Sequence, residues 1–576
     1  MIEALGIAMV KNEADVIEAF VRHNLSLMDA LVIIDNDSVD DTRGILVQLQ
    51  REGLPILVFD DPVVGHFQAE IVTAVYRKVV PIFGPRFVFL LDADEFIVAP
   101  SRETLYTQLR ALRPGTQAQY SWRTYIPAPT GPEDGISDPL RSITHRRVDE
   151  KPWYKPIIVT KPKLDMKLSI KQGNHGASYA GLPLRKVKLH DVTIAHFPVR
   201  SVEQFTSKIL VGWIANLERN RYRLDVAHGI HWKVVYDRII RGPAFTAQDL
   251  TLEALKYAQL SKSDFEWPRD VVHDPVAPAY ASLTAQPATT TTSLQKVVRS
   301  IDRIFNPEAH LSGLAADVQF LHDSDRKKRP QRHRRWLFTN NSSHRSAELY
   351  IDLPPFRYLA DRHCPRSVLQ IGPTSGAYLK YFAFHGTSQI KGVDCVETRP
   401  TYLEVDEYVE ADLGKPLDLG QTFDLVIYAG LNYKAAKFDS TVVENITRHA
   451  QDRIALLRSP DTQSESAETL PHMLDLFASA GWYPCYFESL VLRSLSTLPW
   501  LRGGLVVLTR DSADATAARN RLMELEPRSI NRKKHWPAVI AHPLTETEAR
   551  LSAHRDSRAV AMANKLLRAI IARAFH

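Results

Sequence analysis

The chain has 576 residues, of which 44% are hydrophobic and 24% charged, a composition typical of a folded globular protein with more than one domain. Its three cysteines lack CxxC spacing, which argues against a zinc knuckle and a disulfide framework. We find no apolar run of about eighteen residues and no basic-then-apolar leader, so we expect a cytoplasmic protein. The formal charge of +6 concentrates near residues 326–335 and at the C-terminal end, without interleaved aromatic residues or glycines, and predicts no nucleic-acid partner.

The N-terminal part of the chain alternates short apolar runs with segments of helical periodicity. The runs at residues 5–10, 30–34, 55–59 and 86–91 predict buried strands, and the segments between them predict helices. This alternation is typical of an α/β fold with a mainly parallel, Rossmann-like sheet and right-handed crossovers. Such a sheet binds a nucleotide across the carboxyl ends of its strands.

Acidic residues directly follow two of these apolar runs. Asp35 follows the second run, and Asp92 and Asp94 follow the fourth, whose unbroken apolar character predicts burial on both faces. The absence of GxGxxG and P-loop motifs near these acids argues against a dinucleotide-binding or P-loop domain. Two interpretations stay open. The acids cap strand ends in solvent, or they hold Mg²⁺ or Mn²⁺ and, through the metal ion, a diphosphate.

Three motifs occur together in this region, namely MVKNE, IDNDSVDDT and LDADEF. In their order and spacing they resemble the GT-A glycosyltransferases of the family 2 type, especially its branch with a DADEF motif. The resemblance implies a GT-A domain over residues 1–245 and a nucleotide-sugar donor. It implies nucleotide contacts for Asn12, Glu13 and Asp35, of which Asp35 contacts the base. Asp92 and Asp94 would form the DxD motif, which contacts the ribose and the metal ion.

The same resemblance suggests further site residues downstream. Enzymes of this kind commonly take a third metal ligand from a late histidine, which here is His196. Arg200 and Lys208 would bind the donor and neutralise the departing diphosphate. The chain lacks the Glu-Asp motif that commonly supplies the catalytic base, so the base and the stereochemistry of transfer stay open. Glu95, beside the DxD acids, and His175, at the tip of a turn, are our candidates for the base.

Aromatic residues stand among prolines and basic residues after the DADEF motif. Aromatic faces stack on the C–H faces of sugars, so an irregular aromatic segment beside a nucleotide site is typical of an acceptor groove. Taken singly, each of these residues is more often part of a core. The residues concerned are Trp122, Tyr125, Trp153 and Tyr154.

Residues 246–345 are expected to form a helical and low-complexity linker. Its Pro-, Ala- and Thr-rich part, residues 274–292, is expected to bury too little apolar surface for fixed packing. Residues 294–305 have helical periodicity. Residues 513–576 are expected to form a helical tail, in which a basic amphipathic helix near residues 560–574 either packs on its own protein or lies on a membrane.

Residues 346–512 alternate strands and helices for a second time. Over this range the chain resembles the Rossmann-like class of S-adenosylmethionine-dependent methyltransferases, in which glycines let the backbone approach the cofactor and acids bind its ribose and adenine. The matching positions are Gly372, Gly376, Asp394 and Asp412. The middle glycine of the usual motif is missing, and Gln370 replaces the usual acid of the first strand. An active methyltransferase and a retained fold without activity therefore both stay open.

Together these patterns predict a metal-dependent glycosyltransferase fused to a methyltransferase-like domain. The expected partners are a nucleotide-sugar donor and a glycan acceptor, lipid-linked or not, of a bacterial surface polysaccharide such as O-antigen or capsule. The expected cofactors are Mn²⁺ or Mg²⁺, and S-adenosylmethionine for the second domain. The expected location is the cytoplasm, or the inner face of the membrane. Two alternatives remain: a methyltransferase with a carbohydrate-binding N-terminal domain, and a non-enzymatic scaffold.

Overall fold

The structure is a computed structural model, and it describes most of the chain in two compact units. The first unit lies within residues 2–305 and the second within residues 352–524. The described ranges are 2–61, 65–129, 138–161, 167–221, 230–243, 245–257, 264–285, 291–305, 352–372, 376–394, 403–429, 438–457, 469–496, 503–513 and 515–524.

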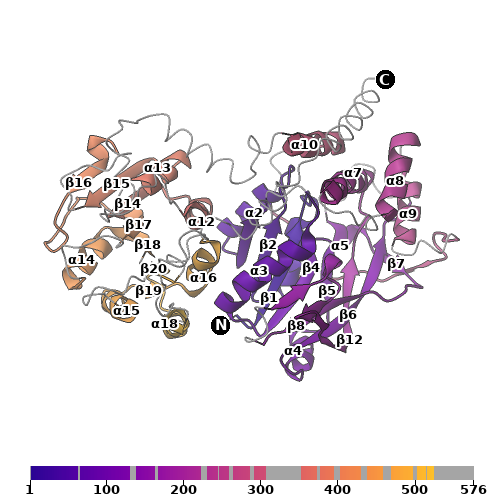
Figure 1. The fold of residues 1–576 in the computed structure, drawn as a ribbon, viewed down its shortest axis with the longest axis horizontal. Helices are drawn as coiled ribbons and strands as arrows, with labels where there is room; N and C mark the ends of the chain where they lie inside the picture. The colour runs from indigo at the N-terminus through magenta and orange to yellow at the C-terminus, as the bar shows by residue number, and fades with distance from the viewer. Residues whose placement is uncertain are drawn as a thin grey trace. The chain divides into compact units, whose positions relative to one another are not determined.

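The first unit combines a large mixed sheet with helices on its faces and at one end (Figure 1). Its elements are β1 (Ala4–Val10), α1 (Ile17–Leu25), β2 (Ala30–Asp35), α2 (Thr42–Arg51), β3 (Ile56–Asp60), α3 (Gln68–Phe83), β4 (Phe87–Asp92), β5 (Glu95–Val98), α4 (Arg102–Arg110), β6 (Thr116–Ile126), α5 (Pro139–Ser142), β7 (His145–Arg147), β8 (Tyr154–Val159), β9 (Leu168–Ile170), the 3₁₀ turn η1 (Gln172–Asn174), β10 (Ala177–Tyr179), β11 (Leu182–Pro183), β12 (Arg185–His196), α7 (Val202–Arg221), α8 (Ile230–Arg241), α9 (Ala247–Lys256), β13 (Val271–His273) and α10 (Ser293–Phe305).

The N-terminal half of the large sheet is parallel, in the order β4-β1-β2-β3. Every residue of β2 is buried, and its Leu31 and Ile33 share a core cluster with Phe20 of α1 and Leu46 of α2. Strands buried on both faces need apolar residues throughout, which explains their unbroken apolar runs. The prediction of an α/β fold with a parallel sheet is therefore confirmed.

The remaining strands of this sheet run in both directions and extend it beyond β4. β8 pairs antiparallel with β4 and with β6, and β12 runs parallel to β6. The strand predicted at residues 86–91 corresponds to β4. β4 ends at Asp92, a turn holds Ala93 and Asp94, and β5 then pairs antiparallel with β12. The turn places the two carboxylates at the edge of the sheet.

The first unit continues past residue 245, where we expected its domain to end. α9 contacts β6, and β13 pairs with β7 in the same sheet. α10, expected as a helix in the linker, packs on α7 through Val297 and Ile301, which meet Val211 and Ile214. These contacts bury the apolar side of α10, and this gives the helix a fixed place on the unit.

The prediction that residues 274–292 lack fixed packing is wrong for their described N-terminal part. Val276 is buried in the main core cluster, and Tyr280 and Leu283 pack against it. Backbone N–H groups of Thr284 and Ala285 donate to the carboxylate of Glu18 at 2.7 and 3.0 Å. Apolar residues spaced between the prolines, together with a buried acceptor, therefore fix a segment whose composition suggested a linker.

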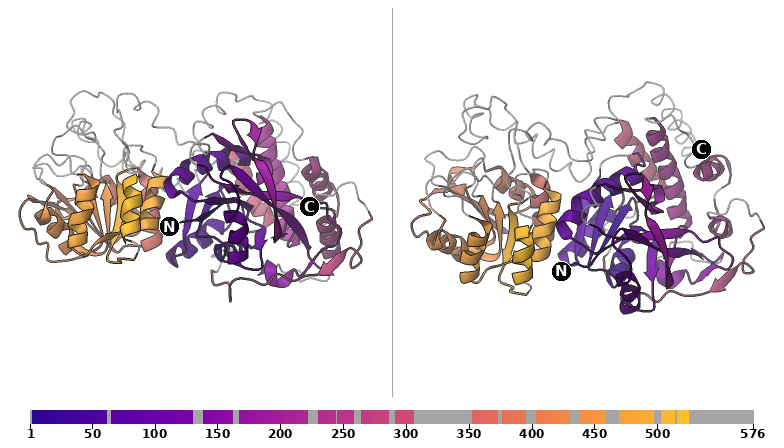
Figure 2. Two further views of the ribbon diagram at one scale, coloured as in Figure 1. Left: turned by 90° about the horizontal axis from the view of Figure 1, so that it is seen from below. Right: turned by 60° about the horizontal axis from the view of Figure 1, so that its bottom comes forward.

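The second unit is a single sheet flanked by helices in both views of Figure 2. Its elements are α12 (Leu353–His363), β14 (Ser367–Ile371), α13 (Ala377–Phe384), β15 (Gln389–Asp394), the 3₁₀ turn η3 (Val405–Glu407), β16 (Tyr408–Glu410), β17 (Phe423–Ala429), α14 (Ser440–Arg448), β18 (Ala450–Leu457), α15 (Leu470–Ser479), β19 (Tyr483–Pro484), α16 (Tyr486–Leu495), β20 (Leu505–Thr509) and α18 (Ala515–Glu524).

The strand order in this sheet is β16-β15-β14-β17-β18-β20-β19. The strands from β16 to β18 are parallel, and β20 is antiparallel to both of its neighbours. The parallel part follows the doubly wound order 3-2-1-4-5, which has a topological switch point beside the first strand. The Rossmann-like sheet expected for the second domain is therefore present.

Two features expected from the sequence lie outside the described residues. These are the basic stretch at residues 326–335 and the amphipathic helix near residues 560–574. Within the described ranges, no helix is both long and apolar enough to cross a membrane.

Substituting Glu18→Ala is expected to loosen residues 274–285, because the buried carboxylate accepts two backbone N–H groups of this segment. Loss of such an acceptor costs about 1–3 kcal/mol locally. Limited proteolysis with peptide mapping should show faster cleavage within this segment. Glu103→Ala is the matched control, since the Glu103 side chain is 79% exposed and lies 3.7 Å from Arg110. Equal cleavage of both variants would contradict the prediction.

Candidate functional site

The candidate site lies at the carboxyl edge of the parallel strands in the first unit. β1 lies between β2 and β4, with Val10 in register with Asp35 and Met9 with Asp92. The acids that follow two separate apolar runs therefore flank the end of one central strand. This is the edge at which open α/β sheets bind their ligands.

The side chain of Asp92 is held by three donors. Lys155 Nζ lies 2.6 Å from Oδ2, while Gln68 Nε2 and Asn174 Nδ2 donate to Oδ1 at 2.8 and 3.0 Å. Asp92 is still 29% exposed, so the carboxylate is oriented and also open to a ligand. Asn174 has a positive φ of 56°, a conformation that Asn tolerates better than most residues.

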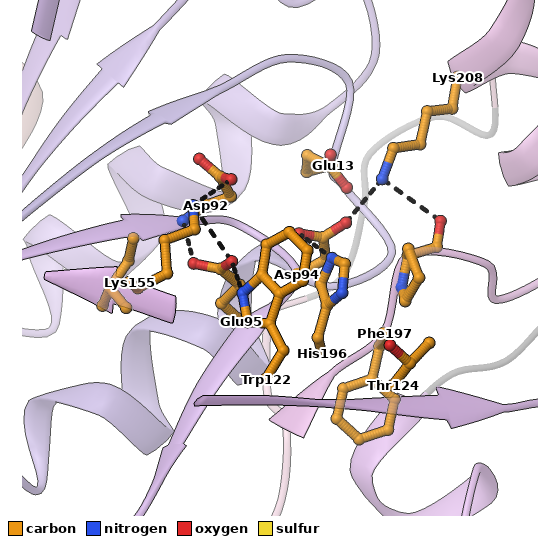
Figure 3. Close-up of polar contacts among 12 residues, drawn as sticks. Glu13, Asp92, Asp94, Glu95, Trp122, Thr124, Lys155, His196, Phe197 and Lys208 are labelled. Carbon is orange, nitrogen blue, oxygen red and sulfur yellow. Dashed lines mark hydrogen bonds and ion pairs between the residues drawn. The ribbon is translucent and has the colours of Figure 1, made fainter. Parts of the chain in front are cut away.

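Lys155 is wholly buried between two carboxylates, as Figure 3 shows. Its Nζ lies 2.6 Å from Asp92 and 3.2 Å from Glu95. Burial opposes the charge of Lys155, but the two acids raise its pKa above the ordinary value. A buried ion pair costs much to break, because the remaining charge has no solvent to compensate it. Lys155 therefore fixes Asp92 relative to β8.

Glu95 is wholly buried and points away from solvent, so the structure argues against it as the base. Its Oε1 accepts from Trp122 Nε1 at 2.7 Å and its Oε2 accepts from the Asp92 N–H at 2.9 Å. Burial raises the pKa of Glu95 to about 8, against the opposing charge of Lys155. Glu95 instead supports the turn between β4 and β5.

Asp94 is buried and forms a separate cluster with His196 and Lys208 (Figure 3). Lys208 Nζ donates to Asp94 Oδ2 at 2.6 Å, and His196 Nε2 lies 3.7 Å from Oδ1. Burial alone would raise the pKa of Asp94, but the positive groups around it, Lys208 foremost, together outweigh burial and hold the pKa well below its usual range. Burial lowers the pKa of His196 to about 3 against the attraction of Asp94, so the imidazole is neutral at pH 7.

The three expected metal ligands do not come together as a set. No group of three His, Cys, Asp or Glu side chains suited to a metal ion occurs among the described residues. Asp94 and the neutral His196 do face each other across 3.7 Å. A carboxylate oxygen and a neutral imidazole nitrogen can both ligate a divalent cation that takes its other ligands from water and phosphate.

Arg200 does not have the role that we expected. It is 1% exposed and makes a bidentate pair with Asp15 at 2.7 and 2.9 Å, while Nη2 also donates to Glu13 at 2.5 Å. The nearby acids overcome burial and raise its pKa. All of these bonds hold the loop after β1, so Arg200 is not available to a diphosphate. Burial raises the pKa of Glu13 to about 7, against the charges of Arg200 and Lys208.

Asn12 and Asp35 organise the loops that follow β1 and β2. The Asn12 N–H donates to Ser38 Oγ at 2.9 Å, and its Oδ1 accepts from the Val39 N–H at 2.7 Å. The Asp35 carboxylate accepts from the Ser38 N–H at 3.1 Å, and burial raises its pKa. Asn12 therefore binds the loop after β2 through both its backbone and its side chain. Asp35 lies at the start of that loop.

Aromatic rings form a continuous surface beside the Asp94 cluster. Trp122 stacks on His196 with ring centroids 4.4 Å apart, and it contacts His175 at 5.2 Å and Trp153 at 6.3 Å. Trp153 is 37% exposed. The structure thus brings two of the four predicted groove aromatics next to the acids. Tyr125 instead belongs to the core, because it is 3% exposed and stacks on Phe197.

The other candidate base, His175, contacts this aromatic surface. It follows η1 and lies against Trp153, with ring centroids 5.7 Å apart. Burial and the charge of Lys155 lower its pKa, so its imidazole is neutral at pH 7. Its Nδ1 has no hydrogen-bond partner among the residues that the structure describes. The ring of Tyr154 contacts a cation instead, with Lys188 Nζ 5.1 Å from the ring centroid.

In the second unit the predicted cofactor residues follow the first strands of the sheet. Gly372 and Gly376 have positive φ angles of 74° and 79°, which require glycine in practice. A Cβ at Gly372 would lie 2.8 Å from the Ala429 carbonyl oxygen. Asp394 ends β15 and is 8% exposed, whereas the Asp412 side chain is 53% exposed in the loop after β16. Gln370 is buried and donates weakly to the Gly372 carbonyl at 3.4 Å.

Sequence reasoning missed three residues that hold Asp92, namely Lys155, Gln68 and Asn174. Lys155 carried a signal, because a lysine inside the apolar strand YKPIIV must either bend to solvent or meet a buried acid. Gln68 and Asn174 carried none, since their contacts with Asp92 depend on chain segments far apart in sequence.

Comparisons with known proteins leave the family of this chain open. No protein-family model and no curated protein matches the sequence. Among solved structures, a SAM-dependent methyltransferase from Aquifex aeolicus is 13% identical with a TM-score of 0.20, over 32% of this chain and 95% of that one. The plantazolicin methyltransferase BpumL is 12% identical with a TM-score of 0.20, over 38% and 99%. A mannose-1-phosphate geranyltransferase from Thermus thermophilus is 12% identical with a TM-score of 0.17, over 46% and 72%.

The neutral state of buried His196 is expected to make the first unit sensitive to acid. The unfolded chain protonates this imidazole near pH 6.5, whereas the folded chain does so near pH 3. The unfolded state therefore binds more protons between these values, and stability falls as the pH falls. His196→Phe keeps a ring against Trp122 but takes up no proton. Between pH 6.5 and 4.5 its free energy of unfolding should fall by about 2 kcal/mol less than that of the wild type.

Pulse proteolysis, followed through peptides of the first unit, measures this difference. His190→Phe is the matched control, since His190 lies on the same strand with an exposed side chain. An identical pH slope for the wild type and His196→Phe would contradict the assignment of a buried neutral imidazole.

Proposed function

We propose that the first unit is a glycosyltransferase that moves a sugar from a nucleotide-sugar donor to a hydroxyl of a glycan. The observation that carries this proposal is the pairing of Asp92 and Asp94 at the carboxyl edge of β4, with Asp35 at the end of a nearby strand and an aromatic surface beside them. The polar sheet edge could bind the nucleotide, and the aromatic rings beside it could stack on a sugar, as this transfer requires.

The donor would lie across the ends of β1, β2 and β4. Asp92 is oriented by Lys155 and accessible, so it can accept hydrogen bonds from ribose hydroxyls. Asp94 and His196 would hold a divalent cation, which supplies positive charge to the diphosphate when bound. Lys208, whose side chain is 23% exposed, adds a second positive charge at the same point.

The acceptor would lie on the surface formed by Trp122 and Trp153, and His175 would act as base. In the transfer the acceptor oxygen bonds to the anomeric carbon, and the bond from that carbon to the diphosphate breaks. The electron pair leaves with the nucleoside diphosphate, and the acceptor proton passes to the neutral imidazole of His175. A surface polysaccharide, with or without a lipid carrier, remains the proposed class of acceptor.

We propose in addition that the second unit binds S-adenosylmethionine, and methylates a sugar hydroxyl if it is catalytic. The specific support is the doubly wound order β16-β15-β14-β17-β18, with Gly372 and Gly376 in left-handed conformations after β14 and Asp394 at the end of β15. Glycines let a cofactor approach the backbone, and an acid at the neighbouring strand end can accept both ribose hydroxyls.

Donor binding is expected to depend on Asp94. Isothermal titration with UDP-, GDP-, dTDP-, ADP- and CDP-sugars in Mn²⁺ should find a ligand for the wild type. Asp94→Asn should bind the same ligand at least about tenfold more weakly and lose the effect of Mn²⁺, because it removes one ligand of the cation and the partner of Lys208. Released nucleoside diphosphate, measured with a glycan acceptor, reports the transfer.

Asp191→Asn is the matched control for this substitution. Asp191 is exposed and has a positive φ of 56°, which asparagine adopts equally well. If no nucleotide sugar binds the wild type with or without Mn²⁺, the glycosyltransferase proposal fails.

Cofactor binding by the second unit is expected to depend on Asp394. Titration with S-adenosylhomocysteine should give saturable binding to the full chain, and Asp394→Asn should weaken it at least about tenfold, because an amide accepts fewer hydrogen bonds from the ribose. Asp475→Asn is the control, since the Asp475 side chain is 62% exposed on α15. Equal affinity of the wild type and Asp394→Asn would remove Asp394 from the site.

A further inference from the structure

Helix α10 lies against the loop that follows β2, although about 250 residues separate them in sequence. Its apolar side is firmly packed, since Val297 and Ile301 are 1% and 4% exposed and meet Val211 and Ile214 of α7. Figure 1 shows α10 and α7 side by side. The Ser293 N–H and hydroxyl also bind Glu203 at the start of α7. The position of α10 on the first unit is therefore well defined by its contacts.

The polar side of α10 directs three cations at the loop. Lys296 Nζ lies 3.3 Å from the Asp40 carboxylate, and Arg299 Nη1 donates to the Val39 carbonyl at 2.6 Å. Arg303 pairs with the Asp37 carboxylate. Because the spacing of these cations is three and four residues, they share one face of the helix. Three ionic or hydrogen-bonded contacts from one helix thus act on a loop of only a few residues.

The loop needs these contacts because its acids are buried. Asp37 is 2% exposed and has a positive φ of 55°, so both its charge and its backbone conformation depend on support. Burial raises the pKa of Asp37 to about 6, and the charges of Lys11 and Arg303 oppose this effect. Lys11 Nζ also donates to the Asn36 carbonyl at 2.6 Å. The loop is therefore held by Lys11, which follows β1, and by α10.

We propose that α10 is part of the donor site, and that Arg303 and Lys296 are positioning residues for nucleoside binding. This inference rests on the proposed function, in which Asp35 at the start of the loop contacts the base. Neither cation needs to touch the donor. Arg303 acts through Asp37 and Lys296 acts through Asp40, and together they hold the loop in the conformation that receives the nucleoside.

The test compares nucleoside diphosphate binding and turnover in the full chain. Titration with UDP, GDP, dTDP, ADP and CDP identifies the diphosphate that the wild type binds. Arg303→Gln should raise its Kd about tenfold or more, and should raise the donor KM with kcat at saturation changed by less than about twofold. Arg303→Lys should restore most of the affinity, because it keeps the charge next to Asp37. Hydrogen exchange of residues 36–41 should be faster in Arg303→Gln.

Arg110→Gln is the matched control, since Arg110 pairs with Glu3 at 2.7 Å on α4 with a side chain 42% exposed. Lys296→Gln provides a second variant should Arg303→Gln fail to fold. The wild type could bind a diphosphate that Arg303→Gln and Lys296→Gln bind with the same affinity. This result would overturn the role of α10 and leave the glycosyltransferase proposal standing. A wild type that binds none of the five diphosphates would overturn the glycosyltransferase proposal and this inference with it.

Discussion

The first unit depends on cations that compensate the acidic side chains buried at the edge of its sheet. Asp94 is 4% exposed, and a carboxylate in such a place is tolerated only when a cation or several donors meet it. Lys155 meets Asp92 and Glu95, and Lys208 meets Asp94. The edge is thus preorganised, because its carboxylates have fixed orientations before any ligand arrives. Preorganised charge is what a site for a charged donor requires.

These cations come from elements that follow the parallel strands in sequence. Lys155 lies on β8 and Lys208 on α7, whereas the acids lie at the end of β4 and in the turn after it. This acidic edge is therefore complete only when the later, mixed half of the sheet has packed on the earlier, parallel half. The aromatic surface belongs to that later half as well, so the regions proposed for the donor and the acceptor share the same supports.

Sequence reasoning predicted the parts of this site that local patterns determine. The buried strands and the acids at their ends follow from apolar periodicity, and the structure places Asp35 and Asp92 at one edge as expected. Sequence reasoning could not assign the role of Arg200, because a guanidinium that binds a diphosphate and one that binds Asp15 look identical in sequence. The packing of residues 274–285 was likewise hidden, since Val276 becomes a core residue only through contacts with distant strands.

The candidate sites of the two units differ in what would hold the proposed ligands. In the first, side-chain charge dominates, and the carboxylates of Asp92 and Asp94 each have a lysine partner. In the second, Gly372 and Gly376 bring the backbone itself close to the sheet edge, and one acid, Asp394, ends the neighbouring strand. A site built on charge suits a diphosphate, which carries negative charge of its own. A site built on backbone approach suits a nucleoside without phosphate groups, such as S-adenosylmethionine, because shape and ribose contacts then carry the recognition.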